Sequence, residues 1–268
     1  MYDLFSEVGE AHWWFEGRRQ VVEAVMGEFL PPNWPGEPTR PEIIDIGCGT
    51  GAMLGMLGGF GHVTGLEMFE EAVAHCRAQY GDVADIRLGQ IPDDLPTDGS
   101  FDVACAFDVI EHIEDDRSAV ERIHDLVRPG GLFVSAVPAF PSLWGDTDVL
   151  SHHFRRYRRR PYVQLLEQAG FQVEKATYFN TWLFPAAATV RIGSRVLRRG
   201  DATPKPDLEL SSKRVDRVLT KVFASERHLV ERTSLPFGVS LLAVARRPAE
   251  SGAPRTGTEP DSIRPEEP

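Results

Sequence analysis

A glycine-rich turn that follows a short apolar strand constrains the fold of this chain most strongly. Residues 43–46 are Ile-Ile-Asp-Ile, and Gly47, Gly49 and Gly51 follow at alternating positions. Glycine adopts backbone conformations that other residues avoid, and it lets a ligand approach the main chain closely. The amides at the start of the next helix are donors for a polar ligand. The chain is therefore predicted to bind a ligand where this strand ends.

Apolar segments alternate with helical segments from residue 42 onward, which indicates an α/β fold. Helices are predicted between the strands, including 116–127 and 161–170, and the sequence Arg-Pro-Gly-Gly at 128–131 is predicted to be a turn. Strands and helices that alternate at this spacing form a largely parallel sheet covered on both faces. We predict a doubly wound, seven-stranded, mostly parallel sheet. Its strands are 42–47, 62–67, 84–89, 101–110, 131–138, 171–180 and 238–247.

Three regions are predicted along the chain. Residues 1–40 form an N-terminal helical cap, with two short helices within 2–30, the second over 18–30, and then a proline-rich loop. Residues 41–247 form the sheet domain, in which the insertion 181–235 is predicted to contain two helices and is a candidate lid. Residues 248–268 are predicted to be disordered, because a segment rich in Pro, Gly and Glu buries too little apolar surface to offset its ordering entropy.

The charge and the apolar runs exclude some classes of protein. The net charge is -11, from 29 basic and 40 acidic residues, which disfavours a nucleic-acid partner. No apolar run approaches the ~20 residues of a membrane-spanning helix. The first residues lack the apolar stretch of a signal peptide, so we expect a cytoplasmic protein. Cys48, Cys76 and Cys105 have no metal-ligand spacing and are expected to be small buried thiols, and no metal is predicted.

An acidic residue ends the second predicted strand. Glu67 lies sixteen residues after Gly51, and a carboxylate there can accept hydrogen bonds from both hydroxyls of a ribose. Gly47, Gly49 and Ala52 also satisfy the loose G-x-G-x-x-A dinucleotide fingerprint. A ribose-bearing cofactor is therefore predicted, and at this point both nicotinamide and adenosylmethionine enzymes remain open.

Four segments in one order carry a more specific signal. They are D-I-G-C-G-T-G, then Glu67, then FDVACAFDVIEHIEDD, then RPGGLFVSAVP. This set resembles the class I S-adenosylmethionine-dependent methyltransferases, especially the small-molecule enzymes with V-I-E-H after the fourth strand. The resemblance covers about 42–180 and the last strand. It implies a Rossmann-like sheet with an antiparallel last strand beside the sixth, S-adenosylmethionine as cofactor, and S-adenosylhomocysteine as product.

The same resemblance implies where the cofactor contacts lie. The methionine end would lie on the glycine loop, with Phe107 and Asp108 near the sulfonium. Glu67 would hold the ribose and Met68 would pack on the adenine. The family often has Asp where this chain has Gln90, which leaves that adenine contact open. The implied cofactor-binding residues are Asp45, Gly47, Cys48, Gly49, Gly51, Glu67, Met68, Gln90, Ile91, Phe107, Asp108 and His112.

Some of these residues also have a purely structural interpretation. Asp45 and Asp108 could be loop carboxylates that cap main-chain amides, and His112 could simply be packed or solvated at a helix start.

An aromatic and basic cluster precedes the sheet. The sequence HWWFEGRR at 12–19 resembles the opening of one subgroup of these methyltransferases. Trp14 and Phe15 could close over the cofactor and exclude water, and Arg18 or Arg19 could pair with its carboxylate. The alternative is a helix packed by its aromatic side chains, with solvated arginines.

A second segment of the same subgroup follows the fifth strand. Asp148 and His153 fall at the spacing of W-x-x-x-D and H-x-R-R-Y, but His152 stands where the subgroup usually has Gly, which puts the loop backbone in doubt. Transfer to oxygen usually needs a base for the hydroxyl proton. Histidine titrates near neutrality, so His153 is the candidate base and Asp148 its orienting partner. The alternative is a structural aspartate–histidine–arginine network.

Two further segments bear on the acceptor. The arginines within 155–160 could attract an acidic or phosphorylated acceptor, although such a run is more often a solvated helix start. The segment 181–199 has apolar residues followed by arginines, so it could rest on a membrane surface or bind a lipid-linked acceptor. A buried lid helix explains it equally well.

The resulting prediction is methyl transfer to a small molecule, with oxygen as the acceptor atom. One alternative keeps the chemistry but changes the acceptor to a lipid-linked glycan, or to a carbon or nitrogen of a secondary metabolite. Others are a nicotinamide-dependent oxidoreductase and a cofactor-binding scaffold without activity. Acceptor identity and oligomeric state do not follow from the sequence.

Overall fold

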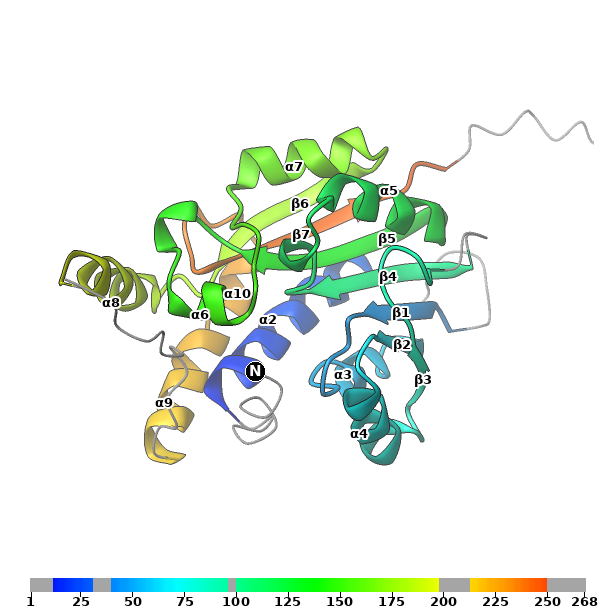
Figure 1. Ribbon diagram of the computed structural model, residues 1–268, viewed down its shortest axis with the longest axis horizontal. Coiled ribbons are helices and arrows are strands. Elements are labelled where there is room, and N and C mark those ends of the chain that lie inside the picture. The colour runs from blue at the N-terminus through cyan, green and yellow to red at the C-terminus, as the bar shows by residue number, and fades with distance from the viewer. Residues whose placement is uncertain (1–11, 31–39, 96–99, 198–212, 250–268) are drawn as a thin grey trace, which may run out of the picture.

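A single sheet organises the molecule (Figure 1). The computed structural model describes residues 12–30, 40–95, 100–197 and 213–249. Within these residues seven strands have the order β3-β2-β1-β4-β5-β7-β6. The first five strands in this order, β3, β2, β1, β4 and β5, are parallel to one another. Strand β7 is antiparallel to β5 and β6, which confirms the predicted fold. The strands are β1 (Glu42–Ile46), β2 (His62–Glu67), β3 (Ala84–Leu88), β4 (Phe101–Phe107), β5 (Val127–Pro138), β6 (Gln172–Phe179) and β7 (Ser240–Arg246).

Helices cover both faces of the sheet (Figure 1). Helices α5 and α7 pack on one face, where Ile123 and Tyr162 are fully buried. Helices α2, α3 and α4 pack on the other, together with side chains of α9 and α10. The described helices are α2 (Trp13–Phe29), α3 (Leu54–Leu57), α4 (Glu70–Tyr80), η1 (Ile110–His112), α5 (Asp116–Leu126), η2 (Pro141–Leu143), α6 (Asp146–Leu150), α7 (Arg159–Gln168), α8 (Phe184–Leu197), α9 (Lys213–Ala224) and α10 (Arg227–Val230).

The N-terminal helix is longer than predicted and belongs to the core. The predicted helix began at residue 18, but α2 begins at Trp13. His12 caps it, because its Nδ1 accepts a hydrogen bond from the Trp14 amide at 3.3 Å. Histidine is not among the preferred N-cap residues, so the residue pattern contains no clear signal for this helix start. Val21 and Val25 of α2 are fully buried against the sheet.

The predicted turn at 128–131 lies inside a strand instead. Val127 pairs with Phe101 and Leu132 pairs with Val103, so the four residues between them form an irregularity within β5. Gly130 has a φ of 87° there, a conformation that glycine adopts readily. The glycine of the predicted turn therefore does adopt a positive φ, but β5 pairs with β4 both before and after these four residues.

The insertion between β6 and β7 contributes three described helices. Helix α9 packs along α2, and its Phe223 is fully buried between Trp13, Trp14 and Phe179. This close approach requires Gly17, since a Cβ there would lie 2.4 Å from the Phe223 ring. The predicted loop of the insertion falls in 198–212, outside the described residues, as do most of the predicted tail and the first eleven residues.

Two composition-based predictions can be compared with the described residues. All three cysteines are buried and free, as expected. Among the described helices, none has both the length and the apolarity needed to cross a membrane.

We predict opposite effects for two alanine substitutions on α2. Gly17→Ala should lower the free energy of unfolding by about 1–3 kcal/mol, because the added methyl group overpacks the contact with Phe223. Gly27→Ala should raise it by as much as about 1 kcal/mol, because its Cβ meets no atom within 4 Å and alanine favours the helix. Urea unfolding followed by circular dichroism measures both. Equal effects of the two changes would contradict the packing argument.

Candidate active site

The glycine turn after β1 has the backbone geometry that its sequence requires. Gly47, Gly49 and Gly51 have φ values of 67°, 59° and 95°, all in the region that disfavours other residues. A Cβ on Gly47 would lie 2.8 Å from Val109, in the loop after β4. A Cβ on Gly49 would meet no atom within 4 Å, so this part of the turn faces open space. The turn therefore offers an exposed stretch of main chain at the carboxyl end of β1.

The side chain of Glu67 is turned inward, toward the glycine turn. It is only 2% exposed. Its Oε2 accepts a hydrogen bond from the Gly49 amide at 2.9 Å, and its Oε1 accepts from the amides of Met68 and Phe69 at 2.9 and 3.1 Å. A carboxylate has about four acceptor positions. Contact with both hydroxyls of a ribose, as predicted, would require the carboxylate to share or release some of these amides.

Asp45 is a buried carboxyl group directly beside the turn. Its side chain is 2% exposed. Burial raises the pKa of Asp45 to about 7, the Arg18 charge opposes this, and the Glu67 charge adds to it. A carboxyl group whose pKa is raised into the neutral range is a feature of binding and catalytic sites, because the shift costs stability.

Arg18 reaches the end of β4 from helix α2. Its buried guanidinium forms an ion pair with Asp108, whose φ of 57° turns the chain sharply after the strand. Arg19 instead pairs with Glu16 on its own helix. Of the two predicted arginines, Arg18 is thus the one at the carboxyl edge of the sheet.

The remaining predicted cofactor residues are spread along this edge. Cys48 and Phe107 are buried, whereas Met68 is 50% exposed after β2. Gln90 is exposed, and its main-chain amide donates a hydrogen bond to Asp94 of the same loop. Ile91 packs against the core on the α5 side.

The Trp14 ring packs against neighbouring aromatic side chains of α2 and α9. Its ring contacts are with Trp13 and with Phe223 of α9, at centroid distances of 5.9 and 5.6 Å. Trp14 therefore anchors the insertion in this structure, which matches the alternative of a helix packed by its aromatic side chains.

Asp148 organises the loop after β5. It is fully buried and accepts hydrogen bonds from His153 Nδ1 at 2.8 Å, Arg156 Nε at 2.7 Å and the Gly145 amide at 2.7 Å. Burial alone would raise the pKa of Asp148, but these hydrogen bonds and the Arg156 charge outweigh it and lower the pKa to about 2. Asp148 is therefore ionised. Because the carboxylate can only accept, His153 carries a proton on Nδ1, and Nε2 is the ring nitrogen that Asp148 leaves uncommitted.

His152 occupies a backbone position suited to glycine. Its φ is 56°, the left-handed conformation that the subgroup's glycine would adopt without strain. The substitution noted in the sequence has thus not displaced the loop from that conformation. The neighbouring His153 keeps its contact with Asp148.

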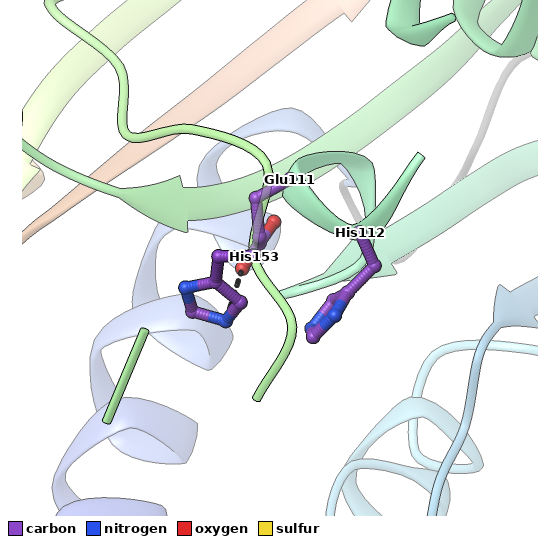
Figure 2. A group of neighbouring side chains, drawn as sticks. All are labelled: Glu111, His112 and His153. Atoms are coloured by element: carbon purple, nitrogen blue, oxygen red, sulfur yellow. Dashed lines mark ion pairs between the residues drawn. The ribbon is translucent and has the colours of Figure 1, made fainter. Parts of the chain in front are cut away.

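Glu111 was not predicted from the sequence as a site residue. It lies in η1, is fully buried, and neither carboxylate oxygen has a hydrogen-bond partner in another described residue. His153 Nε2 lies 3.9 Å from its Oε1, and the His112 and His153 rings are 4.6 Å apart edge to face. Figure 2 shows Glu111 directed toward the His153 ring, with His112 next to Glu111 in η1. Burial and then the Asp108 charge raise the pKa of Glu111 well above its usual range.

The arginine run is partly used within the fold. Arg155 forms an ion pair with Asp116 at 2.7 Å, and the buried Arg156 forms one with Asp148. Arg158, Arg159 and Arg160 are exposed at the start of α7. Only these three remain at the surface for an acidic partner.

Comparison with known proteins identifies the family. Residues 16–176, more than half of the chain, match the family model described as a methyltransferase domain. This chain belongs to that family. The family confirms the predicted class, and S-adenosylmethionine is the cofactor that this class implies. The nicotinamide oxidoreductase that the glycine turn alone left open is not supported.

Relatives and a solved structure agree with this assignment. A protein of Mycolicibacterium smegmatis, named as an S-adenosylmethionine-dependent methyltransferase, is 36% identical over 62% of this chain and 62% of its own length. The chain thus spans less than two thirds of that relative. An O-methyltransferase of Penicillium expansum is 32% identical over 65% of this chain and 69% of its own. In fold, the methyltransferase of Bacillus halodurans has a TM-score of 0.56 at 16% identity, covering 85% of this chain and 99% of that one.

The methyltransferase should show a pH-dependent stability that depends on Asp45. Unfolding exposes a carboxyl group with a pKa near 3.8 in place of one near 7, so unfolding releases a proton and stability falls as pH rises between these values. Asp45→Asn removes this dependence. Its free energy of unfolding, relative to wild type, should increase from pH 4.5 to pH 8 by roughly 2–4 kcal/mol.

Urea unfolding of the cofactor-free protein at the two pH values measures the difference. The exposed Asp82→Asn is the matched control and should show the same offset at both. An offset for Asp45→Asn that does not change with pH would contradict the buried-carboxyl argument.

Proposed function

We propose that this methyltransferase transfers the methyl group of S-adenosylmethionine to a hydroxyl oxygen of a small-molecule acceptor. The observation that carries the choice of oxygen is the buried Asp148–His153 pair at the carboxyl edge of the sheet. A hydroxyl needs help in losing its proton, and an oriented imidazole supplies it. The fungal relative named as an O-methyltransferase supports the same acceptor atom.

The cofactor is proposed to lie across the ends of β1, β2 and β4. Its methionine end would rest against the main chain of the glycine turn, where Gly49 faces open space. Asp45 would face the ammonium group, and Arg18, already paired with Asp108, would attract the carboxylate. Glu67 would take the ribose by exchanging amide partners for hydroxyl groups.

The adenine and the sulfonium complete this placement. Met68, half exposed after β2, offers an apolar surface for the adenine, with Gln90 and Ile91 at its border. Phe107 and Asp108 end β4 beside the proposed position of the sulfonium. His112 follows in η1, between the cofactor and the Asp148–His153 pair.

The chemistry is a direct displacement. The acceptor oxygen attacks the methyl carbon in line with the carbon–sulfur bond, whose electron pair stays on sulfur to give S-adenosylhomocysteine. The Asp148–His153 pair activates the acceptor hydroxyl. Nε2 of His153 is the atom available to it, because Nδ1 is held by Asp148. The protein therefore mainly positions and desolvates two reactants.

A lipid-linked acceptor is the second candidate, favoured by exposed apolar side chains on the insertion. Trp182, Val190, Val215 and Val218 are 53%, 64%, 46% and 60% exposed. Such a surface suits contact with a membrane or a lipid tail. Flotation of the full chain with anionic liposomes decides between them, since a methyltransferase of water-soluble acceptors would stay at the bottom of the gradient.

Cofactor titration and a transfer assay test the proposed function together. Calorimetry with S-adenosylhomocysteine should show one site, and NADH should show none. Methyl-labelled S-adenosylmethionine, incubated with a panel of phenols, catechols and aliphatic alcohols, should label an ether. Label found only on amines or carbon acids would overturn oxygen as the acceptor atom.

We predict that Gly49→Ala weakens cofactor binding without a matching loss of stability. The methyl group would project into the open space over the turn, where the cofactor is proposed to lie. The left-handed backbone adds a strain of about 1–2 kcal/mol. Gly130→Ala is the matched control, since Gly130 also has a positive φ and open space but lies in β5 far from the turn in sequence. Both should lose similar stability, and only Gly49→Ala should lose affinity for S-adenosylhomocysteine.

We predict that His153→Gln lowers turnover by about 100-fold or more, the usual contribution of a proton-handling group. Affinity for S-adenosylhomocysteine should stay within about twofold of wild type, because the side chain lies on the acceptor side. His75→Gln, on the exposed face of α4, is the control and should leave both values unchanged. Full turnover in His153→Gln would remove this residue from the mechanism.

A further inference from the structure

Three metal-binding side chains meet where the loops after β4 and β5 come together. One ligand atom each from Glu111, His112 and His153 lies within 4.8 Å of the other two (Figure 2). We propose that this cluster binds a divalent transition-metal cation, which holds and activates the acceptor hydroxyl. The second half of this statement rests on the proposed function, whereas the site itself does not.

The buried carboxylate of Glu111 is the first argument for a cation. It has no exposed surface, and no other described residue donates a hydrogen bond to either of its oxygens. Burying such a group without a partner is strongly unfavourable. The two nearby arginines do not pair with it, because Arg18 bonds to Asp108 and Arg156 bonds to Asp148. A cation bound at this point supplies Glu111 with the counter-charge that neither arginine provides.

The orientation of the two imidazoles is the second argument. His153 donates from Nδ1 to Asp148, which leaves the lone pair of Nε2 on the side of Glu111. His112 has a hydrogen bond to the main chain of Ser151. Metal-binding histidines characteristically donate their second ring nitrogen to a carboxylate or a main-chain carbonyl, which fixes the tautomer. Both rings have such an outer contact.

The distances and ligand types indicate which cation fits. Two ligands of a tetrahedral site with bonds of ~2.1 Å lie about 3.4 Å apart, so the 3.9 Å between His153 Nε2 and Glu111 Oε1 needs only a small contraction. Two imidazole nitrogens and one carboxylate suit Zn²⁺, Co²⁺ or Mn²⁺ better than Ca²⁺ or Mg²⁺. Three protein ligands leave a coordination position open, as in catalytic sites.

An acceptor hydroxyl at that open position would be activated by the cation. Coordination lowers the pKa of the hydroxyl, its proton leaves to solvent, and the bound oxygen attacks the methyl carbon as the carbon–sulfur bond breaks. His153 then acts as a ligand, and Asp148 as the group that orients it. Turnover would depend on His153 whether it acts as the base or as a metal ligand, so metal binding must be measured separately.

The test uses the full chain without an affinity tag, treated with chelator and dialysed. Calorimetric titration with ZnCl₂ should show one site per chain, and CoCl₂ should give visible absorption of a low-symmetry Co²⁺ site. Glu111→Gln and His112→Gln should each weaken Zn²⁺ binding at least tenfold, while the control His75→Gln binds as wild type. Urea unfolding followed by circular dichroism shows that each variant is folded.

The outcomes separate the site from the proposed function. Zn²⁺ binding of wild type equal to that of the Glu111→Gln, His112→Gln double variant would overturn the site, even if the protein transfers methyl groups to oxygen. Zn²⁺ bound at the cluster, with methyl transfer unchanged by chelation, would overturn the role of the cation at the acceptor. Zn²⁺ binding lost in both single variants, together with chelator-sensitive transfer, would establish both parts.

Discussion

The carboxylate of Glu67 connects the loop after β1 with the loop after β2. It accepts hydrogen bonds from Gly49 in one loop and from Met68 and Phe69 in the other, while almost fully buried. The turn after β1 can reach it because Gly47 and Gly49 adopt left-handed conformations, and the Gly47 amide itself bonds to the Leu66 carbonyl of β2. The loop after β4 in turn packs against Gly47. A ribose whose hydroxyl groups donate hydrogen bonds to Glu67 must compete with these amides, so cofactor binding and the position of the glycine turn are coupled.

The acceptor side is built on a different principle. On the cofactor side the hydrogen-bond partners of Glu67 are main-chain amides, which any sequence supplies once the glycines allow the turn. Beyond β5 the partners are side chains: Asp148 holds His153 and Arg156, and Arg156 also donates to the Ala139 carbonyl at 3.1 Å. An ionised aspartate buried with two such donors is strongly stabilised in one geometry. The structural network posed as an alternative from the sequence is thus present, and the proposed catalytic pair of Asp148 and His153 is part of it.

This difference explains what the sequence predicted and what it did not. The strands followed from apolar runs, since a sheet covered on both faces must be apolar throughout, and the glycine turn followed from a conformational requirement local to a few residues. The start of α2 was wrong because it depends on a histidine cap, and the turn at 128–131 was placed outside the strand that contains it. Glu111 was not predicted, because the His153 ring beside it comes from another loop. Spacing along the chain does not reveal ligands that only the fold brings together.

Two buried carboxyl groups at the carboxyl edge of the sheet have no buried cation of their own. Asp45 and Glu111 both have raised pKa values, whereas the buried Arg18 and Arg156 are already paired with Asp108 and Asp148. Ionising either carboxyl group without a counter-charge costs stability, and a positively charged ligand bound beside it recovers part of that cost as binding free energy. At the proposed cofactor position the sulfonium of S-adenosylmethionine would be such a ligand, but the thioether of S-adenosylhomocysteine would not. With the cofactor in that position, methyl transfer would remove a positive charge beside these groups, so this electrostatic contribution would favour binding of the cofactor over binding of the product.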